Sequence, residues 1–170
     1  EDVLEGAELD LSQRQPGKPA AGTNEGAHCA GFRFCRSADG VELAVDRWAP
    51  AGDAAAADEP ARGPGAVAFV LVHGLASNAR LWDGVAESLV AHGHPVVTVD
   101  LRGHGRSSKP NGPYDTPTVA EDVAAVISAL GLERPVIAGQ SWGGNVVLEM
   151  AARRPGATRG VVCIDGGWLE

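Results

Sequence analysis

A serine in a glycine-rich hexapeptide is the sharpest chemical feature of the sequence. Residues 139–144 read Gly-Gln-Ser-Trp-Gly-Gly, so that Ser141 has a glycine two positions away on each side. The hexapeptide lies between an apolar run at residues 135–138 and a helical pattern at residues 142–153. A serine at such a tight strand-to-helix turn is held in a strained conformation with its hydroxyl pointing outward, and glycine neighbours let the backbone pass closely. We therefore expect Ser141 to be a nucleophile, the alternative being a plain glycine-rich turn.

A second motif, His73-Gly74-Leu75, follows the end of an earlier apolar run. Acyl transfer needs two backbone donors directed at the oxyanion of the transition state, and a glycine turn after a central strand can supply one of them. We nominate the backbone N–H groups of Leu75 and Trp142, the second at the start of the helix that follows the serine. His73, Gly74 and Trp142 would then contact the substrate. The alternative is that His73 and Gly74 form only a tight turn.

A third motif, Asp-Leu-Arg-Gly-His-Gly-Arg-Ser at residues 100–107, is rich in glycine and charge. Loops of this kind often lock the exit of a strand through Asp–Arg pairs and backbone hydrogen bonds. Dinucleotide binding is a weak alternative, because residue 108 is serine where a third glycine is needed and no helix is expected to begin there. The sequence contains no phosphate-binding P-loop motif.

Strand and helix patterns alternate around these motifs. Residues 32–35 and 41–45 alternate apolar and polar side chains around a turn at residues 38–40, which predicts a β-hairpin. Thr118 is the expected N-cap of the second helix. Further strands are expected at residues 66–72, 96–99, 135–138 and 160–164, and helices at residues 81–92, 119–130 and 142–153. The predicted fold class is α/β, with a mostly parallel sheet covered by helices on both faces and an antiparallel N-terminal hairpin.

Residues 32–170 resemble the α/β-hydrolase fold superfamily. The resemblance rests on four features that occur in the expected order: the hairpin, the His-Gly turn, the D-x-R-G-H-G-x-S loop and the G-x-S-x-G motif. The resemblance implies that Ser141 is the nucleophile and that the N–H groups of Leu75 and Trp142 form an oxyanion hole. Because residue 141 is Ser and not Asp, the chain differs from the haloalkane dehalogenases and epoxide hydrolases. Esterase, lipase, carbon–carbon bond hydrolase, lactonase and cofactor-free haloperoxidase-like members fit better. The resemblance implies no cofactor and no metal.

A serine hydroxyl needs a base that removes its proton, and the base needs an orienting acid. In the resembled superfamily both follow the serine, whereas this sequence has no histidine after His104. His104 is expected at the edge of the sheet that carries Ser141, but one strand away. His92 and His94 precede a strand and are expected at the opposite edge. Asp165, which follows the last predicted strand, is a candidate acid.

The sequence predicts one partial domain. Residues 1–30 contain six acidic residues with Pro and Gly interspersed, which predicts a disordered tail. Residues 49–65, rich in Ala, Pro, Asp and Gly, are expected to form a loop. Residues 31–170 would form an α/β-hydrolase core truncated after the sixth strand, without the cap and the C-terminal strands. The edge of the last strand would then be left unpaired.

Composition argues against several classes of partner. The 170 residues carry 14 Lys and Arg against 22 Asp and Glu, a net charge of -8, which argues against nucleic-acid binding. No apolar run approaches the ~20 residues that cross a bilayer, so no membrane partner is expected. Three cysteines without C-x-x-C spacing indicate neither a disulfide framework nor a zinc site. Without a recognisable secretory signal, the expected location is cytoplasmic.

The predicted function is that of a serine hydrolase acting on a carboxylic ester, or on a similar acyl or carbon–carbon bond, through an acyl-enzyme. The partner would be a small-molecule acyl substrate, and the chain as given would be weak or inactive. One alternative is a non-catalytic α/β-hydrolase-like fragment or pseudoenzyme, which a histidine within reach of Ser141 would exclude. Another is an acyltransferase of the same fold, in which an alcohol or thiol instead of water resolves the acyl-enzyme. The oligomeric state stays open.

Overall fold

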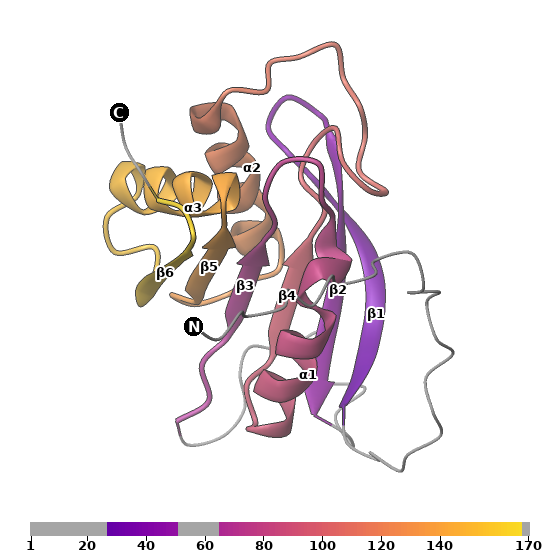
Figure 1. The fold of residues 1–170 in the computed structure, drawn as a ribbon, viewed down its shortest axis with the longest axis vertical. Helices are drawn as coiled ribbons and strands as arrows, with labels where there is room; N and C mark the ends of the chain where they lie inside the picture. The colour runs from indigo at the N-terminus through magenta and orange to yellow at the C-terminus, as the bar shows by residue number, and fades with distance from the viewer. Residues whose placement is uncertain (1–26, 51–64, 168–170) are drawn as a thin grey trace, which may run out of the picture.

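A six-stranded sheet forms the centre of the computed structural model, which describes residues 27–50 and 65–167. The strand order is β1-β2-β4-β3-β5-β6 (Figure 1). β1 pairs antiparallel with β2 and β2 antiparallel with β4, while all other pairs are parallel. The bounds are β1 (Ala27–Arg36), β2 (Glu42–Pro50), β3 (Phe69–Val72), β4 (Val96–Val99), β5 (Val136–Gln140) and β6 (Gly160–Ile164). The predicted α/β fold with an antiparallel N-terminal hairpin is confirmed.

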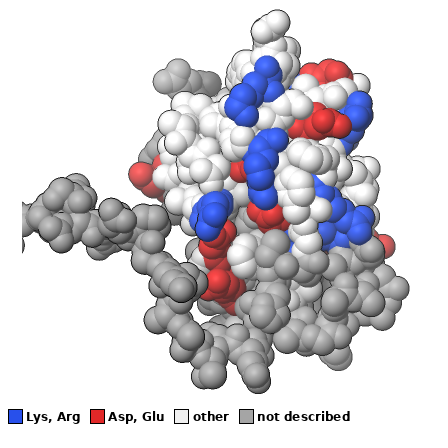
Figure 2. All heavy atoms as spheres, turned by 90° about the vertical axis from the view of Figure 1, so that its right-hand side faces the viewer, with Lys and Arg blue, Asp and Glu red and all other residues white. Residues whose placement is uncertain are grey.

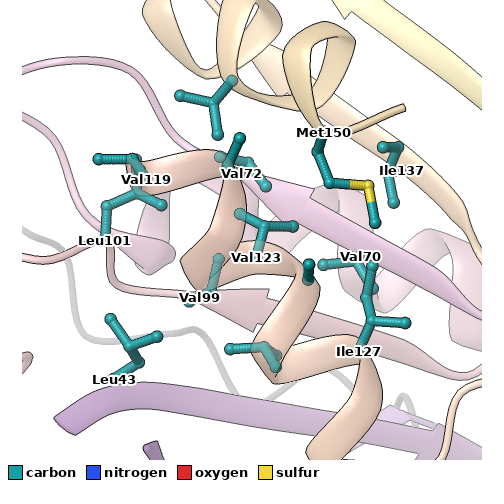
Figure 3. Close-up of a cluster of buried hydrophobic side chains, with 14 of the residues drawn as sticks. Leu43, Val70, Val72, Val99, Leu101, Val119, Val123, Ile127, Ile137 and Met150 are labelled. Atoms are coloured by element: carbon teal, nitrogen blue, oxygen red, sulfur yellow. The ribbon is translucent and has the colours of Figure 1, made fainter. Parts of the chain in front are cut away.

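Helices cover both faces of this sheet, as predicted. A short 3₁₀ helix, η3 (Ala79–Trp82), leads into α1 (Asp83–Ala91) on one face, and α2 (Thr116–Ala129) and α3 (Trp142–Arg153) lie on the other (Figure 1). The core under α2 and α3 is shown in Figure 3. Its buried side chains come from α2 at helical spacing and from alternate positions of the strands, and include Val119, Val123, Ile127, Val70, Val72, Val99 and Ile137.

The opposite face of the sheet packs a second cluster under α1. Leu71, which lies between the two β3 valines of the first core, points to this side because successive strand residues alternate between faces. Trp82 is 4% exposed and packs there against Ala86 and Val90 at helical spacing. Trp82 is therefore a packing residue of this second cluster.

The starts of α2 and β3 are among the predicted element boundaries that differ from the structure. α2 begins at Thr116, so Thr118 is not its N-cap. The cap is Asp115, whose carboxylate accepts a hydrogen bond of 2.9 Å from the Thr118 N–H. Pro117 sits in the first turn, where its missing N–H has no intrahelical partner to lose. β3 begins at Phe69, three residues later than predicted, because the preceding residues do not join the ladder.

β1 extends the hairpin beyond the predicted residues. It begins at Ala27, inside the segment predicted as a tail, and the rest of that segment, residues 1–26, lies outside the described residues. Residues 51–64 of the predicted loop also lie outside them. In the two described stretches, no helix is long and apolar enough to cross a membrane.

The loop at residues 100–107 is locked by buried charge, as its composition predicts. Arg102 is 1% exposed, and its guanidinium donates to both carboxylate oxygens of Asp122 in α2, at 2.5 and 2.7 Å. It also pairs with Asp39 in the hairpin turn at 3.0 Å. Hydrogen bonds from Ser37 and then from Arg102 lower the pKa of Asp39 to about 2. Arg102 therefore joins the loop, α2 and the hairpin.

A second arginine of the loop forms an ion pair closer to the surface. Arg106 donates to Asp100 at 3.1 Å and to Asp46 of β2 at 3.0 Å, and its guanidinium lies 4.5 Å from the ring centroid of Phe32. Acidic and basic side chains lie next to one another on the face shown in Figure 2. Partly exposed pairs of this kind contribute little each, so the buried Arg102 pair is the stronger constraint.

Asp122→Ala is expected to lower the free energy of unfolding by about 3–5 kcal/mol, because it leaves the Arg102 charge buried without its main partner. Asp39→Ala removes a partner whose side chain is 46% exposed, and should cost about 1 kcal/mol or less. Urea denaturation of the two variants beside the wild type measures both values. Equal losses would contradict the ranking of the two pairs.

Candidate active site

Ser141 lies at the turn between β5 and α3 in a strained backbone conformation. Its φ is 52° and its ψ is −126°, outside the regions that residues with a Cβ favour. The Ser141 N–H donates to the carbonyl of Ile164 at 2.9 Å, and the Ser141 carbonyl accepts from the Gly144 N–H at 2.8 Å. The structure thus places a strained serine at a strand-to-helix turn, which is the context that the G-x-S-x-G motif requires.

Close backbone packing explains the glycines around this serine. A Cβ on Gly139 would lie 2.1 Å from the carbonyl oxygen of Gly143, and a Cβ on Gly143 would lie 2.5 Å from the carbonyl oxygen of His73. A Cβ on Gly74 would lie 3.0 Å from the Cβ of Ser141. No side chain fits at the first two positions. The His-Gly turn after β3 therefore packs directly on the serine turn.

The two nominated backbone donors lie in these packed turns. Trp142 is the first residue of α3, so its N–H has no intrahelical acceptor. The N–H of Leu75 forms no hydrogen bond to the part of the chain that the structure describes. The Trp142 indole donates to Thr116 Oγ1 of α2 at 3.0 Å, an anchor that no sequence pattern indicated. Both N–H groups are available to an external acceptor.

His73 is completely buried and both of its ring nitrogens bind the backbone. The Leu101 N–H donates to Nε2 at 3.0 Å, so the ring proton is on Nδ1, which donates to the Gly74 carbonyl at 2.7 Å. Burial lowers the pKa of His73, although the hydrogen bond to Gly74 opposes this shift. His73 therefore shapes the turn next to the serine and has no nitrogen left to act as a base.

The other described histidines are placed as predicted. His92 follows α1 and His94 precedes β4, at the edge opposite to Ser141, and His94 Nδ1 accepts from the Val67 N–H at 3.2 Å. The ring of His104 packs edge-on against that of His73, with centroids 5.1 Å apart, and its Nδ1 donates to the Arg102 carbonyl. Among the described residues no histidine hydrogen bonds to Ser141.

Asp165, the candidate acid, lies in the turn after β6 with a φ of 49°. This turn packs on the serine, because a Cβ on Gly166 would lie 2.0 Å from the Ser141 carbonyl oxygen. Asn145 of α3 holds the turn by accepting a 2.8 Å hydrogen bond from the Gly167 N–H, a role that its place in the sequence did not reveal. Asp165 is exposed at the same edge as Ser141, and its part as an acid stays a prediction. Trp168, which follows this turn in the sequence, lies outside the described residues.

The described side chains offer no obvious metal site at this edge or elsewhere. Within residues 27–50 and 65–167 no group of three or more His, Cys, Asp or Glu side chains could hold a metal ion. The polar groups that the fold gathers at the carboxyl edge include a serine hydroxyl, backbone N–H groups and a carboxylate. Such a set is suited to attack on a carbonyl group and stabilisation of the resulting oxyanion.

Gly139→Ala is expected to lower the free energy of unfolding by about 3 kcal/mol or more, because the new methyl group would overlap the backbone of α3. The matched control is Gly84→Ala in α1, where a Cβ would meet nothing within 4 Å. The control should be neutral or stabilising by up to about 1 kcal/mol. Thermal and urea unfolding would measure both, and a mild effect of Gly139→Ala would contradict the close packing at the turn.

The lowered pKa of His73 predicts a pH dependence of stability. Below about pH 6.5 the unfolded chain binds a proton at this residue while the folded protein does not, so the free energy of unfolding falls as the pH is lowered. His73→Gln, whose amide can donate to Gly74 and accept from Leu101, should reduce this loss between about pH 6.5 and pH 5. Urea denaturation at both pH values tests this, and an unchanged dependence in the variant would contradict a neutral His73.

The sequence profile described as the alpha/beta hydrolase fold matches residues 67–170. The chain is 39% identical over 97 residues to a non-heme chloroperoxidase of Streptomyces lividans, covering 56% of this chain and 35% of that protein. It is 39% identical over 89 residues to the AB hydrolase superfamily protein YisY of Bacillus subtilis, covering 52% of this chain and 33% of that protein.

Among solved structures, the esterase RhEst1 from Rhodococcus sp. ECU1013 superposes with a TM-score of 0.64 at 29% identity. The superposition covers 79% of this chain and 46% of the esterase. The chain spans about a third of the length of these two curated relatives and less than half of the esterase. The profile match over most of the described body, together with the fold, shows that the chain belongs to the alpha/beta hydrolase fold family.

Proposed function

We propose that Ser141 is the nucleophile of a serine hydrolase that acts on a carboxylic ester, or on a similar acyl or carbon–carbon bond. The backbone conformation of Ser141, with a φ of 52° at the turn between β5 and α3, carries this proposal. Strain at a non-glycine residue persists only where the surrounding structure enforces it, and it gathers at functional sites. The enforcing contacts here come from Gly74 and Gly166, which pack on the serine from two other strand ends.

In the proposed reaction, Ser141 Oγ bonds to the carbonyl carbon of the substrate while the carbonyl π electrons move onto oxygen. The N–H groups of Leu75 and Trp142 donate hydrogen bonds to the oxyanion. When the carbonyl re-forms, the leaving group departs with the electrons of the broken bond and takes up the proton released by the serine, and an acyl-enzyme remains. Water then attacks the acyl carbon, releasing the acid and restoring the serine.

The proton of the serine hydroxyl must pass to a base in this scheme. His73 is not available, because both of its nitrogens already bind the backbone. We therefore propose that the described residues supply the nucleophile and the oxyanion donors, and that turnover by this chain is slow. Removing the base from a serine enzyme leaves only the contributions of the oxyanion hole and of binding.

The relatives support hydrolase chemistry in general terms. Their names include a putative carbamate hydrolase of Caulobacter segnis and an esterase from Exiguobacterium antarcticum. These names differ in substrate, so they support hydrolysis in general and no particular acyl group. The proposed partner of this chain is accordingly a small-molecule acyl substrate.

The test combines covalent labelling with turnover. The purified chain is treated with a fluorophosphonate probe and assayed with p-nitrophenyl acetate, beside Ser141→Ala and the control Ser88→Ala, an exposed serine of α1. We expect slow labelling of the wild type and of Ser88→Ala, and none of Ser141→Ala, because the proposal assigns the two backbone donors to Ser141 and not to Ser88. Labelling that survives in Ser141→Ala, or wild-type protein that stays unlabelled, would contradict the proposal.

A further inference from the structure

A cavity of about 190 Å³ opens at the edge of the sheet opposite to Ser141. Its walls are residues 66–68 before β3, residues 132–134 between α2 and β5, and Arg159 before β6. β5 separates the cavity from Ser141, and five strand residues span roughly 16 Å. The cavity is therefore a separate feature from the candidate active site.

Two arginines without partners line this cavity. Across residues 27–50 and 65–167, neither the Arg134 nor the Arg159 side chain forms an ion pair or a hydrogen bond. By contrast, Arg153 and Arg154 at the end of α3 each pair with a glutamate. Two positive charges on one cavity repel each other unless an anion lies between them. The two guanidinium charges make the cavity electrostatically suited to an anion.

The backbone at Arg134 has an unfavourable conformation. Arg134 has a φ of 45° and is followed by Pro135, although a residue before proline favours extended conformations. Among the described residues the other non-glycine residues with positive φ are Ala76, Ser141 and Asp165, all in loops at the carboxyl edge of the sheet. Glycine would adopt this conformation without cost. The strained residue is thus one whose side chain lines the cavity.

Glu133 also lines the cavity, so its negative charge bears on which anion would bind there. A carboxylate repels an anion that can only accept hydrogen bonds, such as sulfate. Near neutral pH a phosphate group keeps a P–OH for part of the time, since its second pKa is about 6. That hydroxyl can donate to Glu133 while the other oxygens accept from the two guanidinium groups, whose fork matches phosphate geometry.

We infer that Arg134, Arg159 and Glu133 form a binding site for a phosphate group, separate from Ser141. The ligand is inorganic phosphate or the terminal phosphate of a small monoester. The two arginines supply charge-assisted hydrogen bonds, and the glutamate selects an anion that carries a proton. This site does not depend on the reaction proposed for Ser141.

Calorimetric titration of the full chain with inorganic phosphate, glycerol 3-phosphate and sulfate, at matched ionic strength and pH, tests the inference. We expect one phosphate per chain with a dissociation constant of about 1 mM or lower, and weaker binding of sulfate. Arg134→Gly and Arg159→Gln should each weaken phosphate binding about tenfold or more. Glycine relieves the strained φ at position 134, so Arg134→Gly should unfold at a temperature no lower than the wild type. A loss of phosphate binding by this variant would then not come from misfolding.

Two further variants make the test specific. Arg80→Gln in η3 removes the same charge from a distant exposed residue, and should bind phosphate like the wild type. Glu133→Gln should abolish the preference for phosphate over sulfate. Binding of either phosphate source supports the site, and the tighter source identifies the ligand. The inference would be overturned if neither inorganic phosphate nor glycerol 3-phosphate bound, or if the wild type bound phosphate and sulfate with equal affinity. It would also be overturned if Arg134→Gly bound phosphate like the wild type, or if Arg80→Gln weakened binding as much as the cavity variants.

Discussion

The backbone of Ser141 depends on the approach of three strand ends to within contact distance. The turns after β3, β5 and β6 meet around it, and Gly74, Gly139, Gly143 and Gly166 each occupy a place where a side chain would collide with a neighbour or press against it. A residue with a Cβ keeps a φ of 52° only when such packing leaves it no relaxed alternative. The parallel sheet and its helices make this packing possible, because they fix the positions of the strand ends.

Hydrogen bonds extend this packed unit to the loop at residues 100–107. His73 connects the turn after β3 to the loop by accepting from the Leu101 N–H. Asp100 accepts from the Ala79 N–H at 2.7 Å, which attaches the start of η3. Burial alone would raise the pKa of Asp100. The backbone N–H groups of Ala79 and Arg106, together with the Arg106 side chain, lower this pKa overall. The carboxyl edge therefore holds together through short, buried polar contacts as well as apolar packing.

The sequence predicted the elements and the motifs, because both depend on local patterns. Alternation revealed the hairpin, continuous apolar runs revealed the buried strands, and G-x-S-x-G at a strand–helix junction revealed the position of Ser141. The N-cap of α2 was misassigned to Thr118 because Asp115 and Thr118 are both good caps, and the choice depends on where Pro117 falls.

Contacts between residues far apart in the chain could not be predicted. Arg102 pairs with Asp39 across 63 positions, and the Ser107 hydroxyl accepts from the Ala44 N–H across another 63. The strained φ of Arg134 also had no local signal, since a residue before proline is expected to be extended. These features arise only once the strands are assembled.

The stability of Ser141→Gly relative to Ser141→Ala tests the central claim most directly. Both variants remove the hydroxyl, but only glycine relieves the conformation at a φ of 52°. Relief of this strain outweighs the greater chain entropy that glycine adds to the unfolded state, so Ser141→Gly should be the more stable by about 1 kcal/mol in urea denaturation. A Ser141→Ala variant as stable as Ser141→Gly, or more stable, would show that the serine is not held in a strained turn.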